Sequence, residues 1–169
     1  MILSIIVLAL VTLQRLGELV LARRNTRRLL AAGAYEVGAA HYPLIVALHA
    51  AWLIGLWALA VRRPVQIDWL AVFVGLEALR VWVMLSLGSR WTTRIIILPG
   101  APLVRKGPYR LISHPNYLVV AAEIAVLPLV FGLGLYAVIF TLLNAAMMVV
   151  RIGAEQSALG LGHSQAVRG

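Results

Sequence analysis

The sequence predicts an all-α integral membrane protein with about five transmembrane helices. Of its 169 residues 62% are hydrophobic, and the mean hydropathy is +0.94, whereas soluble globular proteins are about 45–50% apolar. Five apolar stretches follow one another, each long enough or nearly long enough to cross the ~30 Å hydrocarbon core of a bilayer. We expect one membrane domain over residues 1–169, with the N-terminal helices in 1–88 and a catalytic half in 89–160.

The predicted spans can be read directly from the hydropathy of the chain. They are Ile2–Leu21, Pro43–Val61, Asp68–Leu87, Tyr117–Phe131 and Leu135–Val150. Arginines follow the first and second stretches, and long polar connections precede the second and fourth. The last two stretches are slightly short and are joined at Gly132–Gly134, which is typical of a tight helical hairpin because glycine readily ends a helix.

The charge distribution predicts how the chain is oriented. The net charge of +9 comes from 15 basic and six acidic residues, and the basic residues gather in the connections after the first and third stretches. The positive-inside rule places these connections and the C-terminus in the cytosol, with the N-terminus outside. Because the charges flank apolar stretches, nucleic acid is not an expected partner. The chain has no cysteine, which excludes disulfides and thiolate zinc sites, and no metal ligand set is predicted.

Several ionisable residues fall inside the predicted spans, where a charge costs ~2.5–3.5 kcal/mol on insertion scales and usually faces a partner or a cavity. Two oppositely charged pairs lie three residues apart on one helix: Arg15 with Glu18, and Glu77 with Arg80. We expect each pair to neutralise itself. Glu123 has no basic residue within one turn and follows His114 by about two turns, so it is a candidate substrate-binding residue. His49 is expected to be a hydrogen-bonded packing residue.

The polar stretch Leu103–Tyr117, with the sequence LVRKGPYRLISHPNY, interrupts the apolar pattern. It cannot continue a transmembrane helix, because Pro108 and Pro115 each remove a backbone donor and clash with the preceding turn. Irregular backbone beside a membrane persists only where protein or water satisfies its polar groups. The stretch is therefore a candidate ligand pocket, and a second polar cluster, Arg151–Glu155, follows one hairpin later.

These two clusters resemble the isoprenylcysteine carboxyl methyltransferase family. The family motif is matched by Gly107–Arg110 and His114–Tyr117, and after one helical hairpin by Arg151, Glu155 and Leu159, in the family's order and spacing. Enzymes of this family lie in the membrane and bind S-adenosylmethionine (SAM) at its cytosolic face. The resemblance thus implies a SAM-dependent methyltransferase with a cofactor pocket on that side.

Three positions depart from the family pattern. They are Ser113 in place of arginine, Gln156 in place of a frequent glutamate, and Leu118 in place of a small residue. Residues of the N-terminal half resemble a bacterial branch encoded beside type III polyketide synthases, which implies the inner membrane of a bacterium. The matching residues include Arg15, Glu18, Arg24, Asn25, Tyr35, Glu36, His41, Tyr42, His49 and Trp52. Members of that branch O-methylate long-chain alkylpyrones or alkylresorcinols.

The resemblance also assigns roles by position. Cofactor contacts fall on Ala101, Pro102, Leu103, Val104, Tyr109, His114, Pro115, Asn116, Tyr117 and Glu155. Arg151 would bind the methyl acceptor, and Arg151 and Glu155 would be the catalytic residues. Arg94 is a further cofactor candidate. The planar guanidinium of arginine suits an anionic oxygen, and residues four apart share one face of a helix.

The leading hypothesis is therefore methylation of a ring hydroxyl on a long-chain alkylpyrone or alkylresorcinol, a lipophilic acceptor that enters from the membrane lipid. One alternative is methylation of a prenylcysteine carboxyl group or of a phospholipid amine. Another is a small transporter or non-enzymatic membrane subunit, which would place a substrate path near the bilayer midplane. The sequence leaves the oligomeric state open.

Overall fold

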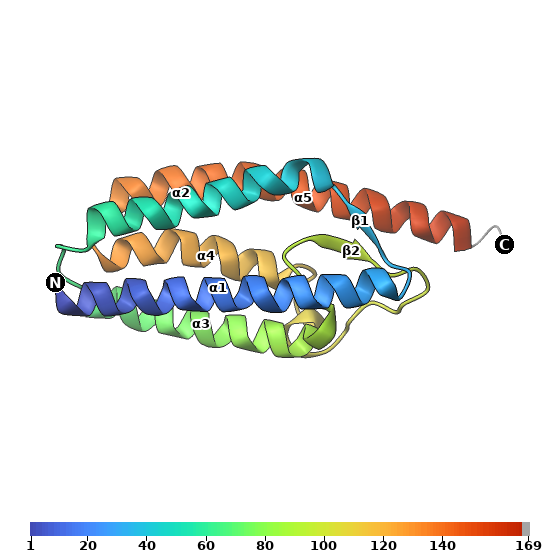
Figure 1. Ribbon diagram of the computed structural model, residues 1–169, viewed down its shortest axis with the longest axis horizontal. Coiled ribbons are helices and arrows are strands. Elements are labelled where there is room, and N and C mark those ends of the chain that lie inside the picture. Colours follow the sequence, from blue (N-terminus) through green and yellow to red (C-terminus); the bar gives the residue numbers. More distant parts are fainter. Residues whose placement is uncertain (167–169) are drawn as a thin grey trace.

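The computed structural model describes the backbone of residues 1–166 and the side chains as far as Glu155, together with that of Ser157. Five helices run side by side (Figure 1). They are α1 (Ile2–Ala31), α2 (Tyr42–Ala60), α3 (Ile67–Leu87), α4 (Pro115–Val130) and α5 (Gly134–Ala166). Four helices are long and apolar enough to cross a membrane, and α4 is a shorter apolar helix. The predicted all-α membrane fold is confirmed.

The predicted spans agree closely with α2, α3 and α4, but α1 and α5 are longer than predicted. Helix α1 continues through the arginine cluster to Ala31, and α5 continues past Val150 through Arg151 and Glu155. The mean hydropathy falls after Leu21 and Val150, but the helix propensity stays high, because arginine, leucine, alanine and glutamate are all good helix formers. Both helices therefore extend beyond their apolar stretches and carry basic and catalytic candidates on regular backbone.

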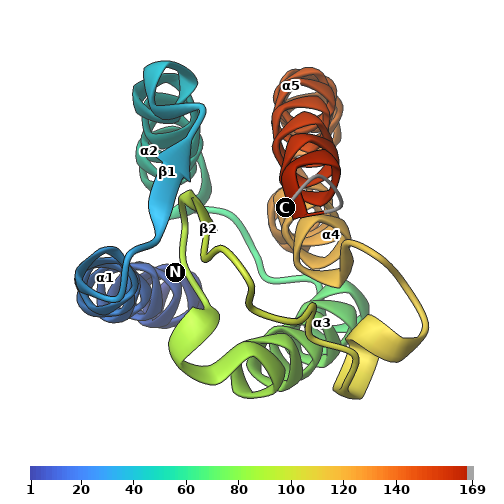
Figure 2. The same ribbon diagram turned by 90° about the vertical axis from the view of Figure 1, so that its right-hand side faces the viewer.

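Two short strands, which the sequence did not predict, join the two long connections. Strand β1 (Tyr35–Val37) pairs antiparallel with β2 (Ile95–Ile97), with Tyr35 opposite Ile97. Figure 2 shows the pair lying across one end of the bundle, between α1, α2 and α3. Three 3₁₀ segments complete these connections: η1 (Ala39–His41), η2 (Gly88–Arg90) and η3 (Gly107–Arg110). The strands thus hold residues of both halves of the chain together at this end.

The apolar core lies toward the opposite end of the bundle, near the N-terminus. Leu8, Leu56 and Leu127 are fully buried there and come from α1, α2 and α4. The hydroxyl of Ser4 donates to the carbonyl of Arg63 at 2.6 Å and ties the start of α1 to the connection between α2 and α3. The N-terminus and the end of α5 lie at opposite ends of the bundle (Figure 1). Which end faces the cytosol stays a prediction.

Candidate active site

Two cavities adjoin at the end of the bundle that carries the long connections. The first, of about 300 Å³, lies between α1, α2, α4 and α5 and is lined mainly by apolar side chains, so we call it the apolar cavity. The second, of about 500 Å³, lies among β2, residues 98–105, η3 and the start of α4, and we call it the polar cavity. Four residues line both cavities and form what we call the junction: Thr92, Asn116, Tyr117 and Arg151. Ligands bound in the two cavities would meet there.

The polar cavity gathers the residues that the sequence assigned to a cofactor. Its lining includes Ala101, Pro102, Leu103, Val104, Tyr109, His114, Asn116, Tyr117 and Glu155. Pro115 does not line it, because this residue is buried at the first position of α4, where a proline fits without losing a helical hydrogen bond. Arg94 lines the cavity too. Whether these residues bind a cofactor stays a prediction, but the fold brings them to one place.

The loop that precedes α4 is shaped by its glycine and by contacts with α3. Gly107 has a φ of 57°, a conformation that favours glycine, and a Cβ at this position would collide with Ser86 and come close to Trp82. The next turn places Tyr109 in the wall of the polar cavity, where burial and then the nearby Glu155 carboxylate raise the pKa of its hydroxyl. Tyr109 therefore presents a neutral phenol to any ligand.

Glu155 is held by two residues from the start of α4. The Tyr117 hydroxyl donates to Oε2 of Glu155 at 2.7 Å, and Nδ1 of His114 lies 3.8 Å from the same oxygen. The His114 and Tyr117 rings are stacked, with centroids 5.5 Å apart. The hydrogen bond from Tyr117 fixes one carboxylate oxygen at the wall of the polar cavity. Leu159 and Gln156, the other motif positions of α5, lie outside the described side chains.

Arg151 is a buried cation without a carboxylate partner in the described part of the chain. Its side chain is 8% exposed; Nη2 donates to the carbonyl of Thr93 at 2.9 Å, and the guanidinium lies 5.3 Å from the centre of the Tyr117 ring. Nε has no hydrogen-bond partner among the described residues. Arg151 and Glu155 do not form the intrahelical ion pair that their spacing permits. Because buried charges are usually paired, the junction is suited to an anionic ligand.

Thr93 contacts the first residue of α2, and its neighbour Arg94 pairs with strand β1. The Tyr42 hydroxyl lies 3.0 Å from Oγ1 of Thr93. Arg94 donates to both carboxylate oxygens of Glu36, at 2.9 and 2.8 Å, and its guanidinium lies 4.3 Å from the centre of the Tyr42 ring. The hydrogen bonds with Glu36 raise the pKa of Arg94. These contacts connect the N-terminal half of the chain to residues 93 and 94, and the backbone carbonyl of Thr93 accepts the hydrogen bond from Arg151.

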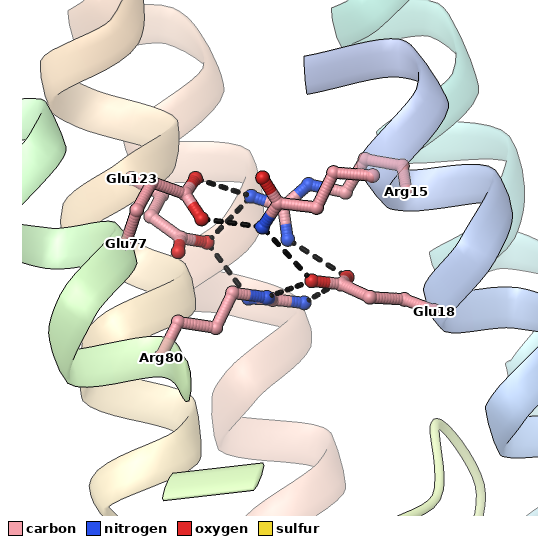
Figure 3. A network of polar contacts seen from close by, with 6 residues as sticks. Arg15, Glu18, Glu77, Arg80 and Glu123 are labelled. Atoms are coloured by element: carbon pink, nitrogen blue, oxygen red, sulfur yellow. Dashed lines mark hydrogen bonds and ion pairs between the residues drawn. The ribbon is translucent and has the colours of Figure 1, made fainter. Parts of the chain in front are cut away.

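An ionic network lies in the wall of the apolar cavity (Figure 3). It consists of Arg15 and Glu18 from α1, Glu77 and Arg80 from α3, and Glu123 from α4. The predicted pair of Arg15 and Glu18 is confirmed, with 3.0 Å between Nη1 and Oε2. The predicted pair within α3 is wrong: Arg80 donates to Glu18 at 2.6 Å and to Glu123 at 2.8 Å.

Tertiary packing explains this difference. A guanidinium has five donors, and carboxylates on neighbouring helices satisfy more of them than one residue on the same helix. Glu77 instead accepts a short hydrogen bond from Gln14 and lies 3.4 Å from Arg15. Glu123 lines the apolar cavity, whereas His114 lines the polar cavity, and Oε2 of Glu123 accepts from both Arg15 and Arg80 at 2.8 Å. Its role in binding a substrate stays a prediction.

His49 forms the expected hydrogen bond but does not simply pack. Its Nδ1 lies 2.8 Å from the carbonyl oxygen of Ile45, one turn earlier on α2. The half-buried ring also lines the apolar cavity with Arg151 and Tyr117. Sequence reasoning missed this second contact, because the cavity exists only once α1, α4 and α5 are packed against α2.

Comparison with known proteins agrees with the motifs. Residues 69–160 match the isoprenylcysteine carboxyl methyltransferase family. Over 159 residues the chain is 37% identical to YpbQ, an uncharacterized protein of Bacillus subtilis (strain 168), which covers 91% of this chain and 95% of that protein. It is 25% identical over 156 residues to an uncharacterized protein of Haemophilus influenzae, covering 86% of this chain and 88% of that protein. No solved structure matches the chain.

Proposed function

This chain belongs to the isoprenylcysteine carboxyl methyltransferase family, and from that premise we propose that it transfers a methyl group from SAM to an anionic oxygen of a lipophilic acceptor. The observation that carries the proposal is Arg151, a buried guanidinium at the junction with no carboxylate partner among the described residues. A bound oxyanion would form the ion pair that this guanidinium lacks among the described residues. A guanidinium in that position would repel an ammonium ion, which argues against a phospholipid amine.

The polar cavity fits SAM by the chemistry of its lining. Oε1 of Glu155, which has no hydrogen-bond partner among the described residues, suits the ammonium or ribose hydroxyl groups of SAM. The guanidinium of Arg105, which also lines the cavity, suits its carboxylate. Tyr109 offers a neutral aromatic face, which attracts cations. Arg90 donates to the carbonyl of Pro102 at 2.6 Å and thereby anchors the loop in the cavity wall. SAM, when bound, supplies a methyl group activated by a sulfonium.

Arg151 would hold and orient the reacting oxygen at the junction. The carbonyl of Thr93 fixes one of its nitrogens, and the Tyr117 ring lies beside the guanidinium, so the remaining N–H groups have a defined direction. Holding the two reactants in contact converts a bimolecular step into an effectively unimolecular one. The apolar lining excludes water, which strengthens the attraction between the guanidinium and the oxyanion. The methyl–sulfur bond breaks as the methyl–oxygen bond forms, and the products are neutral at both centres.

For the acceptor, we propose the ring hydroxyl of a long-chain alkylpyrone or alkylresorcinol. Apolar side chains from four helices line the apolar cavity and suit an alkyl tail, since each buried CH₂ contributes ~0.8 kcal/mol. A prenylcysteine carboxylate would also satisfy Arg151 and fits the family, so it is the second candidate. In either case the tail lies toward the bilayer and the oxygen at the junction, on the side that we propose to be cytosolic.

Purified enzyme in detergent tests both parts of the proposal. We expect saturable binding of labelled SAM, and methyl ethers from an alkylresorcinol and alkylpyrone series offered beside a farnesylcysteine analogue. Methyl-ester formation on the prenylcysteine alone would overturn the acceptor but keep the methyltransferase. Failure to bind SAM would favour a transporter or a non-enzymatic subunit.

A further inference from the structure

Most polar side chains in the wall of the apolar cavity are already engaged with protein. The Thr12 hydroxyl donates to the carbonyl of Leu8 at 2.7 Å and accepts from Nε1 of Trp57 at 3.0 Å. Tyr42 pairs with Thr93. Arg15, Glu18, Arg80 and Glu123 pair inside the ionic network (Figure 3). Among the described residues, Oε1 of Glu123 and the indole nitrogens of Trp52 and Trp91 have no hydrogen-bond partner, but protein encloses these atoms. The groups named here therefore offer little to a ligand in the body of the cavity.

His49 is different, because one of its ring nitrogens is accessible and has no hydrogen-bond partner among the described residues. The carbonyl of Ile45, 2.8 Å from Nδ1, can only accept a hydrogen bond, so Nδ1 carries the proton. In the neutral ring Nε2 is then a hydrogen-bond acceptor. Nε2 has no hydrogen-bond partner within the described part of the chain, yet it is not among the atoms enclosed by protein. A bare acceptor in the wall of an apolar cavity suits a hydroxyl of the ligand.

The position of His49 relative to Arg151 indicates whether Nε2 would bind the reacting hydroxyl of the ligand or a different one. Tyr42 lies beside the junction, because its hydroxyl forms a hydrogen bond with Thr93. The carbonyl of Thr93 accepts a hydrogen bond from Arg151. His49 follows Tyr42 by seven residues, or ~10 Å along the helix. The Cα atom of His49 is therefore displaced from the junction along α2, in a position suited to a second group of an acceptor whose reacting oxygen lies at Arg151.

The two side chains also lean toward one another. Side chains of a helix point toward its N-terminus. The N-terminus of α2 lies at the junction end of the bundle, whereas that of α5 lies at the opposite end (Figure 1). By this rule His49 leans toward the junction and Arg151 away from it, into the apolar cavity that both residues line.

We propose that His49 forms a hydroxyl-binding subsite and that the methyl acceptor is a ring with two hydroxyl groups. This inference rests on the proposed function. The first hydroxyl loses its proton to bulk water before it enters the cavity, is held as an oxyanion by Arg151 and receives the methyl group as the methyl–sulfur bond breaks. The second keeps its proton and donates it in a hydrogen bond to Nε2 of His49. Among the candidate acceptors, an alkylresorcinol has this second hydroxyl, whereas a prenylcysteine carboxylate has none.

A matched pair of substrates tests the subsite. We compare kcat/KM for a 5-alkylresorcinol and for the 3-alkylphenol with the same tail, which lacks only the second hydroxyl. The wild type should prefer the resorcinol by about ten- to hundredfold, the range expected when a desolvated acceptor is left unpaired. In His49→Phe the preference should fall below about threefold, mainly through slower reaction of the resorcinol. His49→Gln, which restores an acceptor oxygen, should recover part of it.

Three results would overturn the subsite. One is an undiminished preference in His49→Phe. Another is an equal loss of rate on both substrates, which indicates a purely structural role. The third is a wild-type kcat/KM for the phenol, or for a pyrone with one hydroxyl, that equals the kcat/KM for the resorcinol. This result needs no variant. His41→Gln, a histidine in the preceding connection outside both cavities, should keep the wild-type preference. If the wild type methylates prenylcysteine alone, the proposed acceptor class is refuted. Binding of labelled SAM shows whether a preparation without activity on any ring acceptor is folded.

Discussion

Arg151 and Glu155 lie one turn apart on α5 but bind different neighbours. Arg151 donates to the carbonyl of Thr93 at 2.9 Å, at the junction of the two cavities, whereas Glu155 accepts from Tyr117 at 2.7 Å in the wall of the polar cavity. Since they do not pair with each other, their charges are available to different ligands. The helix thus separates a position for the acceptor from a position for the cofactor by a single turn.

This separation predicts different effects of substituting the two residues. Glu155→Gln should weaken SAM binding by about tenfold or more, because a hydrogen bond to a charged group contributes ~1.5–3 kcal/mol. Arg151→Ala should leave SAM affinity within about threefold of wild type but lower kcat by about 10²–10³, as expected for the loss of one charge-stabilising donor. Equilibrium binding of labelled SAM and methyl-transfer rates measure the two effects. Loss of SAM affinity at Arg151 alone would show that the roles are reversed.

Glu123 is predicted to be the main stabilising carboxylate of the ionic network. It is 2% exposed and contacts two guanidinium groups, those of Arg15 and Arg80. In Glu123→Ala both positive charges would therefore lose a neighbouring carboxylate. Breaking a buried pair costs ~3–5 kcal/mol, and we expect the free energy of unfolding in detergent to fall by about that amount. Glu77→Ala is the matched control, because Glu77 has a single ion pair, 3.4 Å long, and is 18% exposed. Equal losses of stability in the two variants would contradict this ranking.

The network also shows where sequence reasoning reaches its limit. Spacing predicted the pair Arg15 and Glu18 because both lie on one helix, but the partners of Arg80 come from α1 and α4, which only packing brings near. Most of the cofactor candidates line one cavity, because motif spacing constrains Leu103–Tyr117 and α5 together. Their role in binding a cofactor stays a prediction. Strands β1 and β2 were missed, since each has three residues and is stabilised by pairing with a distant segment rather than by a local pattern.

Tyr42 is predicted to position Arg151 through Thr93. Tyr42→Phe removes the hydroxyl that lies 3.0 Å from Oγ1 of Thr93 but keeps the ring beneath Arg94. We expect kcat to fall by about three- to tenfold, the effect of one hydrogen bond of ~1 kcal/mol, with unchanged SAM affinity. Tyr35→Phe, at an exposed tyrosine of β1, should have no effect on kcat. A loss of SAM affinity equal to the loss of kcat would instead place Tyr42 in the cofactor site.

The orientation in the membrane can be tested with single cysteines, because the chain has none of its own. Arg27, Ser89 and Gln66 are all exposed at the ends of helices or just beyond them. If the arginine-rich connections are cytosolic, Arg27→Cys and Ser89→Cys should resist a membrane-impermeant thiol reagent in intact cells and react after lysis. Gln66→Cys should react in both. Labelling of Ser89→Cys but not Gln66→Cys in intact cells would reverse the orientation and move the polar cavity away from cytosolic SAM.

The last prediction concerns the tail of the acceptor, which we place in the apolar cavity. Each added CH₂ should raise kcat/KM about fourfold until the cavity is filled, because burying one contributes ~0.8 kcal/mol. Val120 lines this cavity, so Val120→Phe should shift the preferred tail to a shorter length. Val138→Phe is the matched control, since Val138 is 56% exposed on the outer face of α5 and its substitution leaves the cavity unchanged. Rates measured over a tail-length series decide the matter: an optimum that stays at the same length in Val120→Phe would show that the tail lies elsewhere, along the lipid-facing surface of the helices.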